Sequence, residues 1–272
     1  MAADASNPGD SAGPSAAHES VLRRSPRWLA AGYGATTDLL FPPRCASCGQ
    51  ECRSRDGTPL LCASCLAELQ PSPLPACRRC AMPCPAADAD GKDCYDCRGR
   101  RLLFEEVRAL GVYQGPLRDV VLRIKHYHHE PLAAALGQLL AERMQQQPLF
   151  QPPDLIAPVP MHWLQRMWRG TNAADTLARS LARALGTRIS GGLLVCRRML
   201  RRQSRLLPEE RRANVRGAFR VSRLSNVTGA RVLVIDDVMT TGATAHEAAR
   251  TLLAAGAASV NIAVVARGTG NF

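Results

Sequence analysis

The sequence predicts an α/β protein with a mainly parallel sheet and helices on both faces, preceded by a small metal-binding domain. First, all but one of the 11 cysteines lie from Cys45 to Cys97, so this region is stabilised differently from the rest. Second, the remaining chain alternates apolar runs with amphipathic helical patterns, which is typical of a parallel sheet. Third, the run VLVI before Asp236 is apolar on both faces and therefore fits a central strand.

The cysteines form an internal repeat. A shift of 32 residues superposes the first five cysteines of this region on the last five, and such a match indicates a duplicated unit. Each copy reads CxxC, thirteen residues, CxxC, which is the spacing of a zinc ribbon around one tetrahedral ion. The predicted ligands are Cys45, Cys48, Cys62 and Cys65 in the first copy, and Cys77, Cys80, Cys94 and Cys97 in the second.

Four thiolates close the coordination shell of a metal, so we expect one or two structural zinc ions and no catalysis by them. The metal would fold a segment that is too poor in apolar residues to fold alone. An iron-sulfur cluster is the alternative, because four thiolates suit that cofactor as well. Cys52 and Cys84 are the extra pair of the repeat, interpreted as spare thiols, with the replacement of a nominal ligand as the alternative.

Composition divides the chain into four predicted regions. Residues 1–19 are rich in Ala, Ser, Gly and Pro and are expected to form a disordered tail. An N-terminal helix and linker at 20–44, the double ribbon at 45–100 and the larger domain at 101–272 follow. The sequence suggests neither a secretory signal nor a membrane span, so we expect a cytoplasmic protein, in which paired cysteines bind metal more often than they form disulfides.

Charge points to polyanionic partners. The 35 Lys and Arg residues against 23 Asp and Glu give a net charge of +12, which favours nucleic acid or phosphorylated small molecules. Ten arginines lie within 197–223. They are interpreted either as a surface for phosphates or single strands, with Arg201, Arg202 and Arg205 as candidates, or as a solvated loop and hairpin over the site. Phe219 is the only aromatic residue of this stretch that could stack on a base.

Periodicity predicts the elements of the larger domain. Strands are expected at 107–113, 154–160, 193–196, 232–235 and 260–265. Helices are expected at 132–146, 172–185 and 244–255. The cluster HYHH at 126–129 is interpreted as an exposed loop, with a metal or base site as the alternative.

The segment RVLVIDDVMTTGAT, residues 231–244, carries the most specific chemistry. Asp236 and Asp237 fall at the carboxyl end of a strand, where open α/β sheets bind ligands. The residues that follow, Thr240, Thr241, Gly242, Ala243 and Thr244, lead into a helix whose free amides attract phosphate. Two acids beside a phosphate would repel it unless they bind something else, such as sugar hydroxyls or Mg²⁺. The segment therefore predicts a ribose phosphate site. The alternative is a plain capped turn, because TAHE at 244–247 is a capping-box pattern.

This segment is similar to the phosphoribosyl-pyrophosphate (PRPP) signature of type I phosphoribosyltransferases, and residues 28–267 resemble the ComF (ComFC) family. The resemblance also rests on DLLFPPRCASCG, LRIKHY, APVP, RGTN and QSRLLPEERRANVRGAF. It implies a type I phosphoribosyltransferase-like sheet preceded by a double zinc ribbon. It also implies that Asp236 and Asp237 hold ribose hydroxyls and metal-bound substrate, and that residues 240–244 cradle the 5′-phosphate.

The resemblance places the pyrophosphate loop at 158–161, after the strand DLIAPVP. Lys125 and Arg169 are the candidate catalytic cations that neutralise departing pyrophosphate, and exposed surface cations are the alternative. Where the family commonly reads RGFNQ, this chain reads RGTNA, which removes an aromatic ring and an amide from that loop.

Two functions fit these features. The first is a PRPP-binding, phosphoribosyltransferase-like protein of the ComF type, linked to DNA uptake, natural competence and DNA utilisation, with single-stranded DNA and a competence helicase as partners. The alternative is an active Mg²⁺-dependent phosphoribosyltransferase of nucleotide salvage or metabolism without a role in DNA. The expected cofactors are structural Zn²⁺, Mg²⁺ and PRPP as ligand. A domain kept only for protein contacts would not need both acids and three threonines, so we expect ligand binding in either case.

Overall fold

The computed structural model describes residues 42–52, 61–69, 75–84, 94, 97–147, 150–201 and 206–269. The predicted tail at 1–19 and most of the predicted helix and linker at 20–44 lie outside these residues. The chain divides into two compact units, Met1–Pro42 and Pro43–Phe272. The second unit contains both sets of cysteines and the whole sheet.

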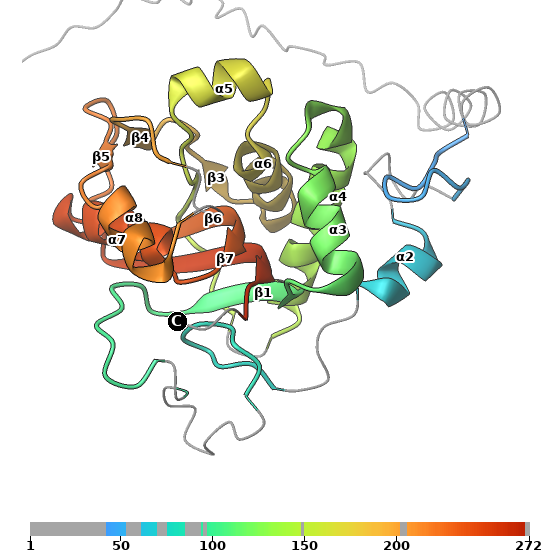
Figure 1. Ribbon diagram of the computed structural model, residues 1–272, viewed down its shortest axis with the longest axis horizontal. Coiled ribbons are helices and arrows are strands. Elements are labelled where there is room, and N and C mark those ends of the chain that lie inside the picture. The colour runs from blue at the N-terminus through green and yellow to red at the C-terminus, as the bar shows by residue number, and fades with distance from the viewer. Residues whose placement is uncertain are drawn as a thin grey trace, which may run out of the picture. The chain divides into compact units, whose positions relative to one another are not determined.

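A five-stranded parallel sheet in the order β1-β7-β6-β2-β3 forms the centre of this unit (Figure 1). Its strands are β1 (Val107–Val112), β2 (Leu155–Pro158), β3 (Arg188–Ile189), β6 (Arg231–Met239) and β7 (Ser259–Arg267). β6 lies between β7 and β2, and its VLVI run is buried, so the predicted central strand is confirmed. Because β2 and β6 run in the same direction, their carboxyl ends meet at the edge where such sheets bind ligands.

One face of the sheet is covered by α3 (Gly115–Arg123), α4 (Glu130–Gln145) and α6 (Ala173–Leu185). Leu233 and Ile235 of β6 pack into this layer. α4 approaches α6 so closely that a Cβ atom on Gly137 would lie 2.5 Å from the carbonyl oxygen of Leu177. The periodicity at 132–146 and 172–185 predicted the two long helices, whereas the shorter α3 is too brief to show a clear period.

The opposite face is covered by α8 (Ala243–Ala254), by the hairpin of β4 (Leu194–Cys196) and β5 (Phe219–Val221), and by the second cysteine copy. Val232 and Val234 of β6 point into this layer, as the strand alternation requires. All four predicted ligands of the second copy belong to the same buried cluster. The second ribbon therefore shares a hydrophobic core with the sheet.

Two further helices were not predicted, and one predicted strand lies outside the parallel sheet. Trp163–Arg169 form helix α5 between the predicted strand at 154–160 and the predicted helix at 172–185, and Pro208–Val215 form helix α7 inside the arginine-rich stretch. The strand expected at 193–196 is β4, which pairs antiparallel with β5 in a separate two-stranded sheet. Both helices are short and rich in arginine or exposed apolar residues, so apolar periodicity does not reveal them. Within the described ranges, none of the helices has the length and apolarity that crossing a bilayer requires.

Candidate functional site

Each ribbon copy begins with the same tight turn around its first cysteine. The amide of Cys45 donates to the carbonyl oxygen of Gln50, and the amide of Cys77 donates to that of Met82, both at 2.8 Å. An isolated β-bridge closes the turn in both copies. The repeat in the cysteine spacing is therefore also a repeat in backbone geometry.

The turns gather the predicted ligand sulfurs into two groups, within each of which the sulfur atoms lie no more than 4.8 Å apart. The groups are Cys45, Cys48, Cys62 and Cys65, and Cys77, Cys80, Cys94 and Cys97. A tetrahedral zinc ion with Zn–S bonds of about 2.3 Å requires sulfur separations of about 3.8 Å. The sulfurs of Cys48 and Cys62 are 3.6 Å apart, as are those of Cys80 and Cys94. Both groups therefore fit a four-thiolate zinc site.

Cys52 and Cys84, the extra pair of the repeat, contribute no sulfur to either group. Their backbone amides donate to the carbonyl oxygens of Pro43 and Pro75, at 2.9 and 2.8 Å. Both residues thus close their turns in the same way through the backbone.

Each group contains at least one thiol whose lowered pKa favours the thiolate form that zinc requires. A hydrogen bond with Ser64, whose hydroxyl oxygen is 3.1 Å away, lowers the pKa of Cys62 to about 6. A hydrogen bond with Cys97 lowers the pKa of Cys80 to about 5. Burial raises the pKa of Cys65 to about 12, so a full set of thiolates requires the positive charge of a metal.

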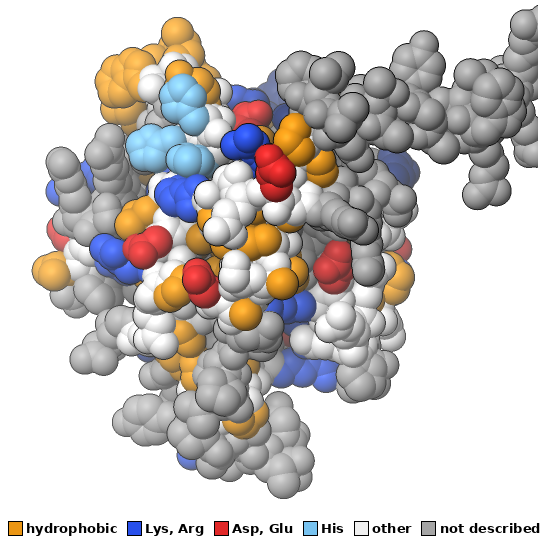
Figure 2. All heavy atoms as spheres, turned by 90° about the vertical axis from the view of Figure 1, so that its right-hand side faces the viewer, with side chains coloured by type: hydrophobic (Ala, Val, Ile, Leu, Met, Phe, Trp, Pro, Cys, Tyr) orange, Lys and Arg blue, Asp and Glu red, His pale blue; other side chains and the backbone are white. Residues whose placement is uncertain are grey.

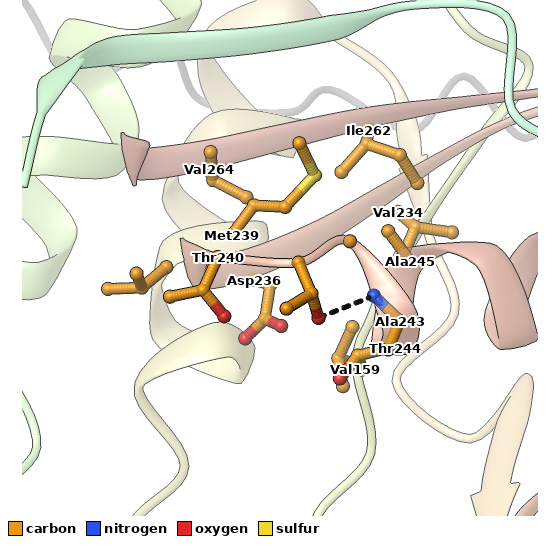
Figure 3. Close-up of a pocket in the computed structure, with 13 residues that line it drawn as sticks. Val159, Val234, Asp236, Met239, Thr240, Ala243, Thr244, Ala245, Ile262 and Val264 are labelled. Carbon is orange, nitrogen blue, oxygen red and sulfur yellow. Dashed lines mark hydrogen bonds between the residues drawn. The ribbon is translucent and has the colours of Figure 1, made fainter. Parts of the chain in front are cut away.

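The predicted phosphate loop at 240–244 joins the end of β6 to the first turn of α8, and every residue of it lines one small pocket (Figure 3). Gly242 caps the helix at φ 74°, a left-handed conformation that favours glycine. The amide of Ala243 donates to the hydroxyl of Thr241 at 3.3 Å. The carboxylate of Asp236 lines the same pocket (Figure 3). A helix amino terminus whose backbone amides lie beside hydroxyl groups is suited to bind a phosphate.

The two acids have different surroundings. Asp237 forms an ion pair with Lys125, so the structure brings this predicted cation to the acids. Burial would lower the pKa of Lys125, but its interactions with Asp237 and the charge of Asp236 outweigh burial and raise that pKa. Burial, together with the charge of Asp237, raises the pKa of Asp236 well above its usual range. Asp236 is the acid that faces the pocket, and Asp237 is the acid that is already paired.

The RGTN segment supports the turn after β2. The amide of Val159 donates to the carbonyl oxygen of Ile235 at 2.8 Å, which joins this turn to β6. The side-chain amide of Asn172 donates to the carbonyl oxygen of Val159 at 3.1 Å and to the carboxylate of Asp175 at 3.2 Å. RGTN therefore holds the predicted pyrophosphate loop at 158–161 in place.

Helix α5 follows this turn and ends at Arg169, the second predicted cation, whose side chain lies outside the described part of the structure. The helix displays Trp163, Met167 and Trp168, which are 61, 71 and 80% exposed. The HYHH cluster forms a short, exposed 3-10 helix, η1 (Tyr127–His129), and among the described residues no group of metal ligands includes its histidines. Figure 2 shows histidine side chains beside an apolar patch on one face of the molecule.

Two arginines that sequence reasoning did not single out contact the phosphate loop. Arg211 of α7 donates to the hydroxyl of Thr240 at 3.0 Å. Arg267, at the end of β7, is 2% exposed and donates to the carbonyl oxygens of Met239 and Thr240, at 3.0 and 2.5 Å. Nothing in their local sequence separates them from other arginines. The family resemblance could have pointed to Arg211, because the segment QSRLLPEERRANVRGAF contains it.

A cavity of about 850 Å³ lies beside the same loop, between residues that follow the second ribbon, the end of α7 and the start of α8. Its lining includes five arginines: Arg100, Arg101, Arg212, Arg216 and Arg250. The only carboxylate among the lining residues is Glu247, which accepts hydrogen bonds from Arg250 at 2.6 Å and from the amide of Gly217 at 2.7 Å. We refer to this feature as the arginine cavity. Its charge suits a series of phosphate groups.

Part of the arginine-rich stretch 197–223 forms the predicted hairpin, with β4 and β5 as its strands. Arg198 donates to the carbonyl oxygen of Arg216 at 3.2 Å and so holds the hairpin together, whereas Arg201 is exposed. Arg202 and Arg205 lie outside the described residues. Phe219 is 4% exposed and packs in the core, so the aromatic side chain predicted as a stacking candidate is not available to a base.

Comparison with known sequences gives two family matches. Residues 127–270 match the phosphoribosyl transferase domain, and residues 36–98 match the double zinc ribbon domain. The DNA utilization protein YhgH of Salmonella typhimurium is 32% identical over 190 residues, which cover 68% of this chain and 81% of that protein. Competence protein F of Haemophilus influenzae is 27% identical over 214 residues, 76% of this chain and 90% of that protein.

Solved structures with a similar fold include a B. subtilis glutamine phosphoribosylpyrophosphate amidotransferase complexed with ADP and GMP. Its TM-score is 0.37 at 20% identity, over 53% of this chain and 30% of that chain. The adenine phosphoribosyltransferase of Leishmania tarentolae has a TM-score of 0.31 at 16% identity, over 51% of this chain and 71% of that chain.

Proposed function

Since the chain belongs to the ComF family, which joins a double zinc ribbon to a phosphoribosyl transferase domain, we propose that its phosphate loop binds PRPP. The observation that carries this proposal is the meeting of three donor and acceptor types at one pocket: the carboxylate of Asp236, the hydroxyls of 240–244 and the first amides of α8 (Figure 3). Amides and hydroxyls suit a phosphate, and an adjacent carboxylate suits the hydroxyls of a ribose.

Each part of the site then has a chemical task. The loop at 240–244 cradles the 5′-phosphate, and Asp236 and Asp237 accept hydrogen bonds from the ribose hydroxyls. Mg²⁺ fits this place, because it prefers carboxylate and phosphate oxygens. Since Asp237 is paired with Lys125, the diphosphate of the ligand would supply further oxygens to the ion. Lys125 and Arg169 would neutralise the charge that gathers on departing pyrophosphate.

We also assign one structural Zn²⁺ to each four-cysteine group, on the strength of the sulfur separations and the match to a double zinc ribbon. The proposed division of the chain is a tail at 1–19, a helix and linker at 20–44, the ribbons at 45–100 and the phosphoribosyltransferase-like domain at 101–272. We propose a cytoplasmic location, where thiols stay reduced and available to metal.

A second candidate function is the handling of single-stranded DNA, with a competence helicase as a partner. The arginine cavity favours it, because five arginines line it against a single lining carboxylate, Glu247, which is paired with one of them, Arg250. The relatives named for DNA utilization and competence agree with this candidate. The phosphate loop and the arginine cavity share Thr241, Gly242 and Ala243, so the two functions can coexist on one chain.

The deciding experiment is a calorimetric titration of PRPP, with and without Mg²⁺, into the zinc-loaded full chain and its D236N/D237N variant. We expect the wild type to bind and the variant to lose binding, because both acids exchange a charged acceptor for an amide. Zinc content and circular dichroism should be unchanged in the variant, which separates loss of the site from loss of the fold.

Equal PRPP affinities in the wild type and the variant would refute the phosphate-loop proposal. Ribose 5-phosphate is the matched ligand control, because it carries the 5′-phosphate but no diphosphate. Release of pyrophosphate from PRPP in the presence of an amine acceptor would measure the alternative function, an active transferase without a role in DNA.

A further inference from the structure

The two ribbon copies are alike in sequence but pack against opposite faces of the sheet. Leu61 and Ala46 of the first copy pack against the layer of α3, α4 and α6. The cysteines of the second copy belong to the core of the α8 face. Among the described residues of the two copies, those of the second copy alone share a packing layer with the phosphate loop.

Arg267 joins the second ribbon to that loop. Its Nε donates to the carbonyl oxygen of Cys80 at 2.7 Å. Its Nη1 donates to the carbonyl oxygens of Met239 and Thr240, and also to that of Gly268. One guanidinium, 2% exposed, thus bonds to the backbone of a predicted zinc ligand and to the backbone at the start of the phosphate loop.

A second contact supports the same connection. A small cavity is lined both by Cys80 and Cys97 of the second ribbon and by Met239, Thr241 and Gly242. Phe104 lines the same cavity, and its Cζ would be 3.8 Å from a Cβ on Gly242. A shift of the ribbon backbone therefore reaches the loop through packing as well as through hydrogen bonds.

A buried guanidinium is a stiff connector. Its donors are fixed in one plane, so the carbonyl groups on its two sides must keep their relative positions for all of them to be satisfied. A donor that loses its acceptor in a buried place stays unsatisfied, because water does not replace the acceptor. The position of the Cys80 carbonyl is set in turn by the CxxC turn, which a four-thiolate metal site holds closed.

We propose that Arg267 is a positioning residue that makes the shape of the phosphate loop, and hence its affinity for PRPP, depend on the metal-loaded second ribbon and not on the first. The predicted effect on PRPP affinity rests on the proposed function. The predicted effect on the order of the phosphate loop does not, because hydrogen exchange measures it without any ligand.

The test compares four variants of the full chain: R267Q, R143Q, C94S and C62S. Arg143 is the matched control for Arg267, because it donates to the carbonyl oxygens of Leu110 and Leu69, at 3.0 and 2.9 Å, on the other face of the sheet. Cys62 and Cys94 occupy corresponding positions of the repeat. The measurements are zinc per chain, PRPP affinity by calorimetry, and hydrogen exchange of the amides at 239–244.

We expect R267Q to keep the zinc content of the wild type, to weaken PRPP binding by about tenfold or more, and to speed exchange at 239–244. C94S should lose the zinc of the second site and show the same faster exchange. R143Q and C62S should leave the exchange of 239–244 and the affinity within about twofold of the wild type. If R267Q leaves the exchange at 239–244 unchanged, or if C62S speeds it as much as C94S does, the proposal is wrong.

The two proposals fail separately. A wild type that does not bind PRPP overturns the proposed function, and the exchange at 239–244 still decides the role of Arg267. If C94S does not fold, R267Q decides the matter alone, because it keeps all eight predicted zinc ligands.

Discussion

Lys125 and Asp237 lie 112 residues apart in the chain and form an ion pair at the carboxyl end of β6. Each side chain is partly buried, with 33 and 20% of its surface exposed. The chain thus supplies its own cation to one of the two acids in the candidate site. A ligand with a diphosphate would draw Lys125 toward itself and leave Asp237 to a metal ion or a hydroxyl.

Replacing Lys125 by Gln tests whether Lys125 leaves Asp237 to bind the diphosphate of the ligand. We expect the affinity for pyrophosphate to fall by about tenfold, because a charge-assisted hydrogen bond is removed, while the affinity for ribose 5-phosphate stays within about twofold. K125R, which keeps the charge, is the control. Calorimetric titrations with both ligands check the prediction, and equal losses for both ligands would mean that Lys125 only supports Asp237.

The raised pKa of Asp236 predicts how stability depends on pH. Between the ordinary carboxyl pKa of about 3.9 and the raised native value, the folded state binds more protons at Asp236 than the unfolded chain does. Stability therefore falls as the pH rises through that window. In D236N this contribution is absent, so we expect a higher melting temperature near neutral pH, together with loss of PRPP binding. Calorimetric melting at several pH values measures it, and a D236N variant that melts below the wild type at neutral pH would contradict the prediction.

Gly137 tests the contact between α4 and α6. A Cβ at this position would lie 2.5 Å from a backbone oxygen that has little freedom to move, so G137A should destabilise the protein by about 1–3 kcal/mol, the usual cost of overpacking. G191A is the control, because a Cβ there would have no neighbour within 4 Å. Urea unfolding compares the two variants. If G137A and G191A are equally stable, α4 and α6 can move apart without a loss in the free energy of unfolding, and the prediction is wrong.

The arginine cavity predicts a salt-dependent affinity for single-stranded DNA. Removing Arg212 and Arg216 together should weaken binding of a labelled oligonucleotide and reduce the slope of log affinity against log salt by about 1.4, or about 0.7 for each phosphate that is no longer neutralised. R188A, an exposed arginine on the edge strand β3, is the control. Fluorescence anisotropy at several salt concentrations gives the slopes. An unchanged slope would make these arginines ordinary solvated surface.

Features that depend on near neighbours in the chain were predictable. The CxxC turns, the strand VLVI, the glycine of the phosphate loop and the start of α8 each follow from local spacing or conformation. The same reasoning placed a strand at 193–196, but a short apolar strand does not reveal which sheet it joins. It also missed α5 and α7, because neither has the apolar period of a buried helix.

By itself, the sequence determined the cysteine repeat, the alternation of strands and helices, and the segment that forms the phosphate loop, because each is written in residues close together in the chain. Only the tertiary structure decided that Lys125 meets Asp237, that the second ribbon shares a core with the sheet, and that Arg267 reaches Cys80, 187 residues away. These contacts depend on the order of the strands and on which face each ribbon covers. Local spacing carries no information about either.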